Sequence, residues 1–222
     1  MCAQKLKTRH GRAYWILFTM IQIALKTIFK IFYRVDVTGL KKIPKKGKYI
    51  ICSNHISYLD PVLMGAYIPR YTYFMAKKEL FSVSFLSNLV TYLNAFPVAR
   101  NGIDRNIFNT SLDILKNENV LGLFPEGTRS TDGIVRDGKK GVGLIAVLSG
   151  APIITMAISG SNKIIQKPHK RIFFPKIKII IGDIIDTVSI ADKNDRKKAI
   201  ELIVDETMKS IKKLYNIISP NN

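Results

Sequence analysis

The chain has 222 residues, enough for one domain that buries a full hydrophobic core without disulfides or metals. Hydrophobic residues make up 47% and charged residues 23%, which excludes a disordered tail or a coiled coil as the main body. The 35 Lys and Arg against 16 Asp and Glu give a formal net charge of +19, which indicates a polyanionic partner such as an anionic bilayer, phosphorylated substrates or nucleic acid.

The first predicted element is an N-terminal helix over residues 13–35, which follows a basic leader. On a helical wheel the polar side chains gather in about a third of the circumference, and they are Arg12, Thr19, Gln22, Lys26, Lys30 and Arg34. The rest of the wheel is mainly apolar, with Trp15, Leu17, Phe18, Met20, Leu25, Ile28, Phe29 and Phe32. A broad apolar face beside a narrow basic one predicts a helix that lies in the headgroup region of a membrane.

Two other interpretations of this helix stay open. It is either a core helix whose lysines extend their charged ends to water, or a membrane span. The span is disfavoured because the most apolar part, residues 14–21, is shorter than the roughly 20 residues that cross a bilayer. A removed signal peptide is not expected, because no small-residue cleavage site follows.

After residue 34 the chain alternates between short β-rich runs and longer helical stretches. The predicted strands cover residues 34–39, 48–53, 71–76, 95–99, 120–124, 153–158 and 176–181. The predicted helices cover residues 61–67, 79–93, 103–117, 142–149 and 195–217. Because the strands are apolar throughout rather than alternating, the sheet should be covered on both faces. The order predicts a single α/β domain with a largely parallel sheet over residues 35–222, preceded by a membrane-associating segment over residues 1–34.

Three histidines limit the search for a catalytic base. His10 lies in the basic leader and His169 in a polar loop, whereas His55 directly follows a predicted buried strand. The carboxyl ends of strands in an open α/β sheet are where ligand crevices form. Asp60, five residues on and just before Pro61, is either the cap of the next helix or the carboxylate that orients the His55 ring for taking a hydroxyl proton. The two cysteines show no zinc spacing, so no metal site is expected.

A second polar cluster follows the predicted strand 120–124. It brings a carboxylate, a flexible glycine, a hydroxyl and a guanidinium onto one loop, as Glu126, Gly127, Thr128 and Arg129. Arginine presents a planar fork that matches phosphate oxygens, and glycine lets the backbone approach a ligand. The alternative is a tight turn in which Glu126 and Arg129 pair with each other.

Residues 54–60, Asn-His-Ile-Ser-Tyr-Leu-Asp, and residues 124–130, Phe-Pro-Glu-Gly-Thr-Arg-Ser, resemble two sequence blocks of one family. That family is the glycerolipid acyltransferases of the bacterial 1-acylglycerol-3-phosphate acyltransferase type. Three further segments are similar to weaker blocks of the same family, namely residues 76–80, 96–100 and 151–158. The resemblance covers roughly residues 35–181.

The chain departs from the family pattern at two positions. Ala99 stands where a small acidic or polar residue usually precedes the arginine, and Thr155 stands where a second proline is common. Both departures bear on which acceptor the chain takes more than on catalysis.

The resemblance implies that the chain moves a fatty acyl group from acyl-CoA or acyl-carrier protein to the sn-2 hydroxyl of 1-acylglycerol 3-phosphate, giving phosphatidic acid. In that scheme His55 removes the hydroxyl proton and Asp60 orients its ring. The residues implied in binding the acceptor and its phosphate are Lys77, Lys78, Arg100, Glu126, Gly127, Thr128 and Arg129. No metal or bound cofactor is implied, because the acyl-CoA or acyl-carrier protein enters as a cosubstrate. The enzyme is expected at the cytoplasmic face of the cell membrane, as a peripheral or monotopic protein on an anionic surface.

Three alternatives to this function are kept. In the first, the acceptor is another lysolipid or an amino-acid-derived lipid, since one fold hosts several acceptors. In the second, the chain is a lipid-binding relative without activity. In the third, which belongs to a different class of function, the chain is a basic nucleic-acid-binding protein. Nucleic acid is not expected as a partner, because the sequence has no recognisable reading motif and its charge is spread over every region.

Overall fold

The structure is a computed structural model that describes residues 12–77, 95–98, 105–166 and 171–219. Within these residues, seven strands form one sheet in the order β1-β9-β6-β2-β5-β3-β4. The strands are β1 Asp36–Thr38, β2 Tyr49–Ser53, β3 Thr72–Lys77, β4 Ala95–Val98, β5 Val120–Leu123, β6 Ile153–Ser159 and β9 Lys178–Ile185. The helices are α1 Arg12–Tyr33, α2 Asp60–Tyr67, α4 Arg105–Lys116, α5 Lys140–Ser149, α6 Thr187–Asp192 and α7 Arg196–Ile218.

The sheet is largely parallel, as the sequence predicts. Strand β2 pairs in parallel with β5 on one side and with β6 on the other, and β3 pairs in parallel with β5 and β4. Strand β9 runs antiparallel to β6, and β1 pairs in parallel with β9. The reversal was not predicted; it follows because β6 and β9 are joined without the crossover helix that a parallel neighbour requires.

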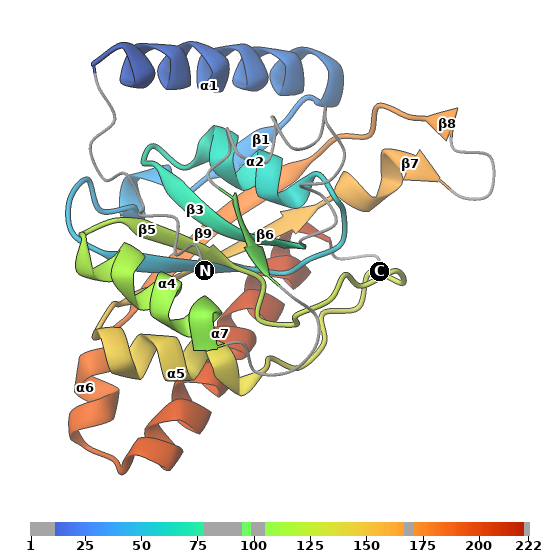
Figure 1. The fold of residues 1–222 in the computed structure, drawn as a ribbon. Coiled ribbons are helices and arrows are strands. Elements are labelled where there is room, and N and C mark those ends of the chain that lie inside the picture. Colours follow the sequence, from blue (N-terminus) through green and yellow to red (C-terminus); the bar gives the residue numbers. More distant parts are fainter. Residues whose placement is uncertain (1–11, 78–94, 99–104, 167–170, 220–222) are drawn as a thin grey trace.

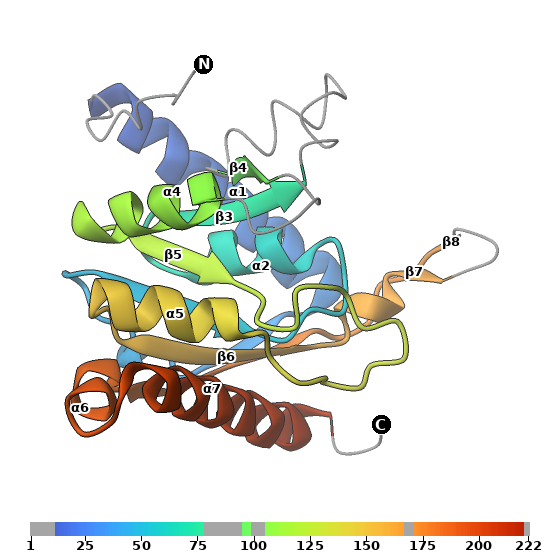
Figure 2. The ribbon, with the colours of Figure 1, turned by 60° about the horizontal axis from the view of Figure 1, so that its bottom comes forward.

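Helices cover both faces of the sheet, with α1 and α2 on one side and α4, α5 and α7 on the other (Figures 1 and 2). Side chains of β2 alternate between the two cores, since Ile50 belongs to the cluster under α5 and α7 while Ile51 belongs to the cluster under α1 and α2. Both are fully buried. The sheet covered on two sides, and the single α/β domain it belongs to, are confirmed.

Helix α7 shows why the C-terminal segment folds as predicted. The Asp195 carboxylate accepts hydrogen bonds from the backbone N–H groups of Lys197 (2.9 Å) and Lys198 (3.0 Å), which starts the helix. One stripe of the helix is buried against the sheet, and it includes Ile203, Val204, Thr207 and Ile211. The short helix α6 was not predicted, and the predicted helix over residues 79–93 lies outside the described residues.

Helix α1 packs on the domain along one stripe and exposes another. The Gln22 side-chain amide donates to the carbonyl oxygens of Gly65 on α2 (3.0 Å) and of Ile68, the residue that follows α2 (2.8 Å), and Phe29 is buried beneath the helix. Part of the predicted polar stripe therefore faces the domain, because the Gln22 amide satisfies carbonyl oxygens at the end of α2. The exposed apolar side chains of the helix are Ile16, Leu17, Met20, Ile23, Ile28, Ile31 and Phe32. By length and composition, residues 16–33 meet the requirement for a membrane span.

Candidate active site

The turn after β2 is held by a buried asparagine. Asn54 donates through Nδ2 to the carbonyl oxygen of Ile158 (2.9 Å), and its Oδ1 accepts from the N–H of the same residue (2.8 Å). This side chain continues the β2–β6 pairing for one step past the last paired residue of β2. It places His55 at the carboxyl edge of the sheet, where β5 and β6 also end.

His55 and Asp60 form a hydrogen-bonded pair at this edge. Their Nδ1 and Oδ2 atoms lie 2.9 Å apart, and Asp60 is fully buried. Oδ2 also accepts the backbone N–H groups of Ile56 and Ser57, each at 2.7 Å, while Oδ1 accepts the Ser161 hydroxyl at 2.6 Å. A carboxylate surrounded by donors accepts the Nδ1 proton as well, so Nε2 is the ring nitrogen with a free lone pair.

The alternative role for Asp60 as a helix cap does not hold. Asp60 is itself the first residue of α2, and the backbone groups that it accepts, those of Ile56 and Ser57, precede the helix. The residue at the N-cap position of α2 is Leu59, whose side chain makes no capping hydrogen bond. The contact that the sequence predicted between imidazole and carboxylate is therefore present, while the catalytic role of the pair stays a prediction.

The His55 ring lies between protein and solvent. It stacks on Phe124 with ring centroids 4.1 Å apart and an interplanar angle of 21°, and its side chain is 17% exposed. Phe124 covers one ring face and Asp60 holds Nδ1. The arrangement fixes the ring orientation and leaves part of the ring accessible to a substrate hydroxyl.

Glu126 is buried and holds the backbone on both sides of the site. Oε1 accepts the N–H of His55 (2.9 Å) and Oε2 accepts the N–H of Arg136 (3.0 Å). The carbonyl oxygen of His55 in turn accepts the N–H of Ser130 (2.7 Å). The tight turn in which Glu126 pairs with Arg129 is thus not observed, because both carboxylate oxygens serve backbone amides. Direct contact of Glu126 with an acceptor stays a prediction.

Two cations flank the loop beside His55. The Arg129 guanidinium carbon lies 3.4 Å from the centroid of the Tyr58 ring, and no carboxylate within the described ranges pairs with it. Gly127 has a φ of +67°, and a Cβ there would come within 2.8 Å of the Lys139 side chain, so Lys139 lies directly over it. Lys139 was not among the predicted site residues. Thr128 is exposed on the same loop.

The loop returns to α5 through a polar turn beside a small pocket. Asp132 accepts the Ser130 hydroxyl (2.7 Å) and pairs with Arg136 (2.8 Å). The hydrogen bond from Ser130 and, after it, those from the Arg136 guanidinium lower the pKa of Asp132 below its usual range.

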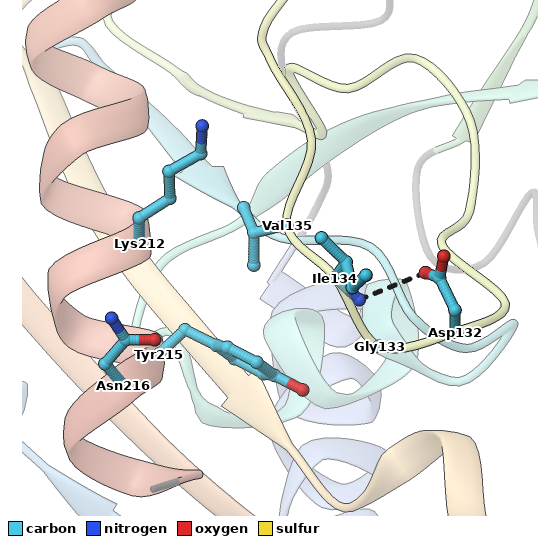
Figure 3. Close-up of a pocket in the computed structure, with 7 residues that line it drawn as sticks. All are labelled: Asp132, Gly133, Ile134, Val135, Lys212, Tyr215 and Asn216. Atoms are coloured by element: carbon cyan, nitrogen blue, oxygen red, sulfur yellow. Dashed lines mark hydrogen bonds between the residues drawn. The ribbon is translucent and has the colours of Figure 1, made fainter. Parts of the chain in front are cut away.

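Between this turn and α7 lies a pocket of about 250 Å³ lined by Asp132, Gly133, Ile134, Val135, Lys212, Tyr215 and Asn216 (Figure 3). We place the chemistry at His55, because this pocket contains no base paired with an orienting group.

The remaining predicted site residues are only partly described. Strand β3 ends at Lys77, at the same edge of the sheet as His55, because β3 runs parallel to β5. The Lys77 side chain, Lys78 and Arg100 lie outside the described residues, so their contacts with an acceptor stay predictions. Ser161 was missed. The available signal was its position just after the predicted strand 153–158.

The chain is similar in sequence to known acyltransferases. A family model described as "Acyltransferase" matches residues 34–159. The 1-acyl-sn-glycerol-3-phosphate acyltransferase of Bacillus subtilis (strain 168) is 28% identical over 195 residues, which cover 87% of this chain and 94% of that protein. The protein of the same name from Borreliella burgdorferi is 24% identical over 200 residues, covering 87% of this chain and 78% of its own length.

A solved structure shares the fold. The crystal structure of the 1-acyl-sn-glycerophosphate (LPA) acyltransferase PlsC from Thermotoga maritima matches with a TM-score of 0.72 and 27% identity, covering 93% of this chain and 84% of that one. Fold, site and matched residues together define an O-acyltransferase. The chain belongs to the acyltransferase family, and its resemblance to the bacterial 1-acyl-sn-glycerol-3-phosphate acyltransferases is confirmed.

Proposed function

We propose that this chain transfers a fatty acyl group from acyl-CoA or acyl-carrier protein to the free sn-2 hydroxyl of 1-acylglycerol 3-phosphate, giving phosphatidic acid. The observation that carries the proposal is the pairing of the His55 imidazole with the buried Asp60 carboxylate at the carboxyl edge of the sheet. The relatives named for the same acceptor support the choice of lysolipid.

The chemistry follows from the free ring nitrogen. His55 Nε2 accepts the proton of the acceptor hydroxyl as the oxygen forms a bond to the thioester carbonyl carbon. The resulting tetrahedral intermediate collapses with cleavage of the carbon–sulfur bond, and the leaving sulfur takes the proton back from Nε2. Asp60 accepts the Nδ1–H throughout and stabilises the imidazolium that forms between the two steps. The acceptor supplies the nucleophile, so no protein serine is acylated.

The acceptor phosphate is assigned to the cations beside the imidazole. Arg129 stacks on Tyr58 through its flat face, which leaves its N–H edge for phosphate oxygens. Lys139 lies over Gly127 on the same loop and adds a point charge. Lys77, Lys78 and Arg100 complete the proposed phosphate-binding set, as the family resemblance implies.

The protein is proposed to lie on the cytoplasmic face of the cell membrane as a peripheral or monotopic protein. The exposed apolar stripe of α1 fits the interfacial region of a bilayer, and a net charge of +19 favours an anionic surface. Attachment of this kind brings the enzyme to an acceptor that is itself an amphiphile.

The test is acyl transfer by the purified protein, with each donor and a panel of lysolipids. His55→Ala should lower turnover by about 10²–10⁴-fold, the usual contribution of a positioned base. His169→Ala is the matched control, because it also removes an imidazole, and it should leave turnover within about twofold. Lysophosphatidic acid should be the best acceptor. Equal turnover by His55→Ala and the unaltered protein would refute the catalytic assignment, and a better lysolipid of another class would refute the acceptor.

A further inference from the structure

Exposed apolar side chains gather on two segments that are far apart in the sequence. Of the 17 large hydrophobic side chains exposed among the described residues, ten lie either on α1 or at positions 172–174. The second segment has three in a row, with Ile172 64%, Phe173 43% and Phe174 52% exposed. Scattered single apolar residues are normal on a surface, whereas a contiguous patch marks an interaction site.

Residues 172–174 and the end of α1 form one surface. The Phe174 ring lies 5.6 Å from Phe32 and 5.5 Å from Tyr33, measured between ring centroids. The Arg34 guanidinium donates to the Phe174 carbonyl oxygen at 3.3 Å, and the Ile177 N–H donates to the Tyr33 carbonyl oxygen at 3.1 Å. These contacts fix the segment beside α1, so the exposed apolar stripe of the helix continues onto it. We call residues 172–174 the apolar spur.

We propose that the apolar spur is a second contact with an anionic lipid bilayer, beside α1, and that it holds the His55 edge of the sheet at the lipid surface. This inference rests on the proposed function, because it assumes an acceptor that resides in the bilayer.

The spur projects from the edge of the sheet that carries the site. Strand β6 ends at that edge, and Ser161, two residues beyond it, donates to the Asp60 carboxylate. Ile164 then accepts the N–H of Phe173 at 2.8 Å. Strands β7 Ile165–Gln166 and β8 Arg171–Ile172 extend past this edge on the same side as the loop after β5 (Figure 2). A bilayer in contact with both α1 and the spur therefore lies next to the imidazole rather than next to the opposite edge.

The charged side chains around the exposed apolar patch favour an anionic bilayer as its binding partner. Lys30 and Arg34 on the α1 side, and Arg171 and Lys176 on the spur side, are exposed at its border. Of these four, Lys176 has a carboxylate within range, Asp36 at 3.9 Å. Apolar side chains framed by cations match the interior and the headgroups of an anionic bilayer. A second copy of the chain brings the same cations and a net charge of +19, so like charges oppose that occupant.

The experiment compares two double variants of the full-length protein. Ile172→Asp with Phe173→Asp alters the spur, whereas Ile184→Asp with Val188→Asp places the same change on exposed apolar side chains at the other end of the sheet. Co-sedimentation with vesicles of phosphatidylcholine and phosphatidylglycerol measures bilayer affinity. The spur variant should bind about tenfold or more weakly, since two apolar side chains lose their burial, and the control should bind like the unaltered protein.

Activity is measured with an acceptor embedded in the vesicles and with a short-chain, water-soluble lysophosphatidic acid. The activity of the spur variant should fall by about tenfold or more with the embedded acceptor and stay within about twofold of the unaltered protein's with the soluble one. Unchanged vesicle binding by the spur variant would overturn the inference, as would an equal loss with both acceptors. A dimer in solution that the spur variant converts to a monomer would also overturn it, because the occupant would then be a second copy. If no protein acylates either acceptor but the difference in vesicle binding persists, the bilayer contact stands and the proposed function fails.

Discussion

Replacing Glu126 with Gln should lower kcat by about tenfold or more while leaving the KM for the lysolipid within about twofold. Its two carboxylate oxygens accept the N–H groups of His55 and Arg136 at 2.9 and 3.0 Å. Glutamine keeps one acceptor oxygen and turns its buried NH2 group toward the other N–H, so that N–H loses its acceptor and the buried NH2 group faces a donor. An unsatisfied buried donor costs about 1–3 kcal/mol, and the backbone that carries the imidazole shifts with it.

The predicted loss is measurable in two independent ways. At this chain length each kcal/mol shifts the Tm by about 2–4 °C, so a cost near 2 kcal/mol lowers the Tm by roughly 4–8 °C. Thermal unfolding followed by circular dichroism and steady-state kinetics on the same preparations supply both numbers. Glu118→Gln is the matched control, because among the described residues the exposed Glu118 side chain accepts one N–H, that of Lys48, which an amide oxygen also accepts.

The kinetic pattern decides between two roles for Glu126. A raised KM with unchanged kcat and unchanged Tm would refute the reasoning, and would show that the side chain binds the acceptor directly. A joint fall of kcat and Tm supports a positioning residue that acts through the backbone of His55.

Two further substitutions test the surroundings of the site. Ser161→Ala removes a donor to the buried carboxylate beside the imidazole, so the free energy of unfolding should fall by about 1–3 kcal/mol in urea denaturation; an unchanged midpoint would contradict this contact. Gly127→Ala adds a Cβ at positive φ against the overlying lysine and should raise the KM for the lysolipid several-fold with about 1 kcal/mol lost in stability. Gly141→Ala is its control: apart from its chain neighbours and the backbone of its own helix, no atom of the described residues lies within 4 Å of the added Cβ, and in α5 the change should stabilise by about 0.5–1 kcal/mol. Equal KM values for both glycine variants would remove the argument for crowding at the loop.

Most of the fold can be predicted from local patterns in the sequence. Unbroken apolar runs such as residues 153–158 mark strands that are buried on both faces, and the order of strands and helices then leaves few topologies. The contact between His55 and Asp60 could also be predicted from a local pattern, because the two residues are five positions apart at the end of one strand. The direction of each strand was harder to predict from the sequence. Strand β9 runs antiparallel because of how the chain connects it to β6, and the apolarity of the strand does not reveal this.

Contacts between distant segments were not accessible from local patterns. Ser161 reaches Asp60 across 101 positions, and only the register of β6 beside β2 brings them together. The helical wheel separated polar from apolar positions in α1 but did not show which stripe packs against the domain, so the contacts of Gln22 were not predicted. Tertiary packing decides such questions, because a helix with two apolar stripes satisfies either choice.

The amide of Gln22 has a mechanical consequence. It makes two hydrogen bonds, to the carbonyl oxygen of Gly65 on α2 and to that of Ile68 just after α2. Because these bonds lie to one side of the α1 axis, the helix cannot rotate about that axis without breaking them. A freely rolling anchor would let the domain tilt through a wide range of attitudes above a bilayer. Under the proposed attachment, the fixed rotation of α1 also fixes the height of the His55 imidazole above the plane of the lipid headgroups.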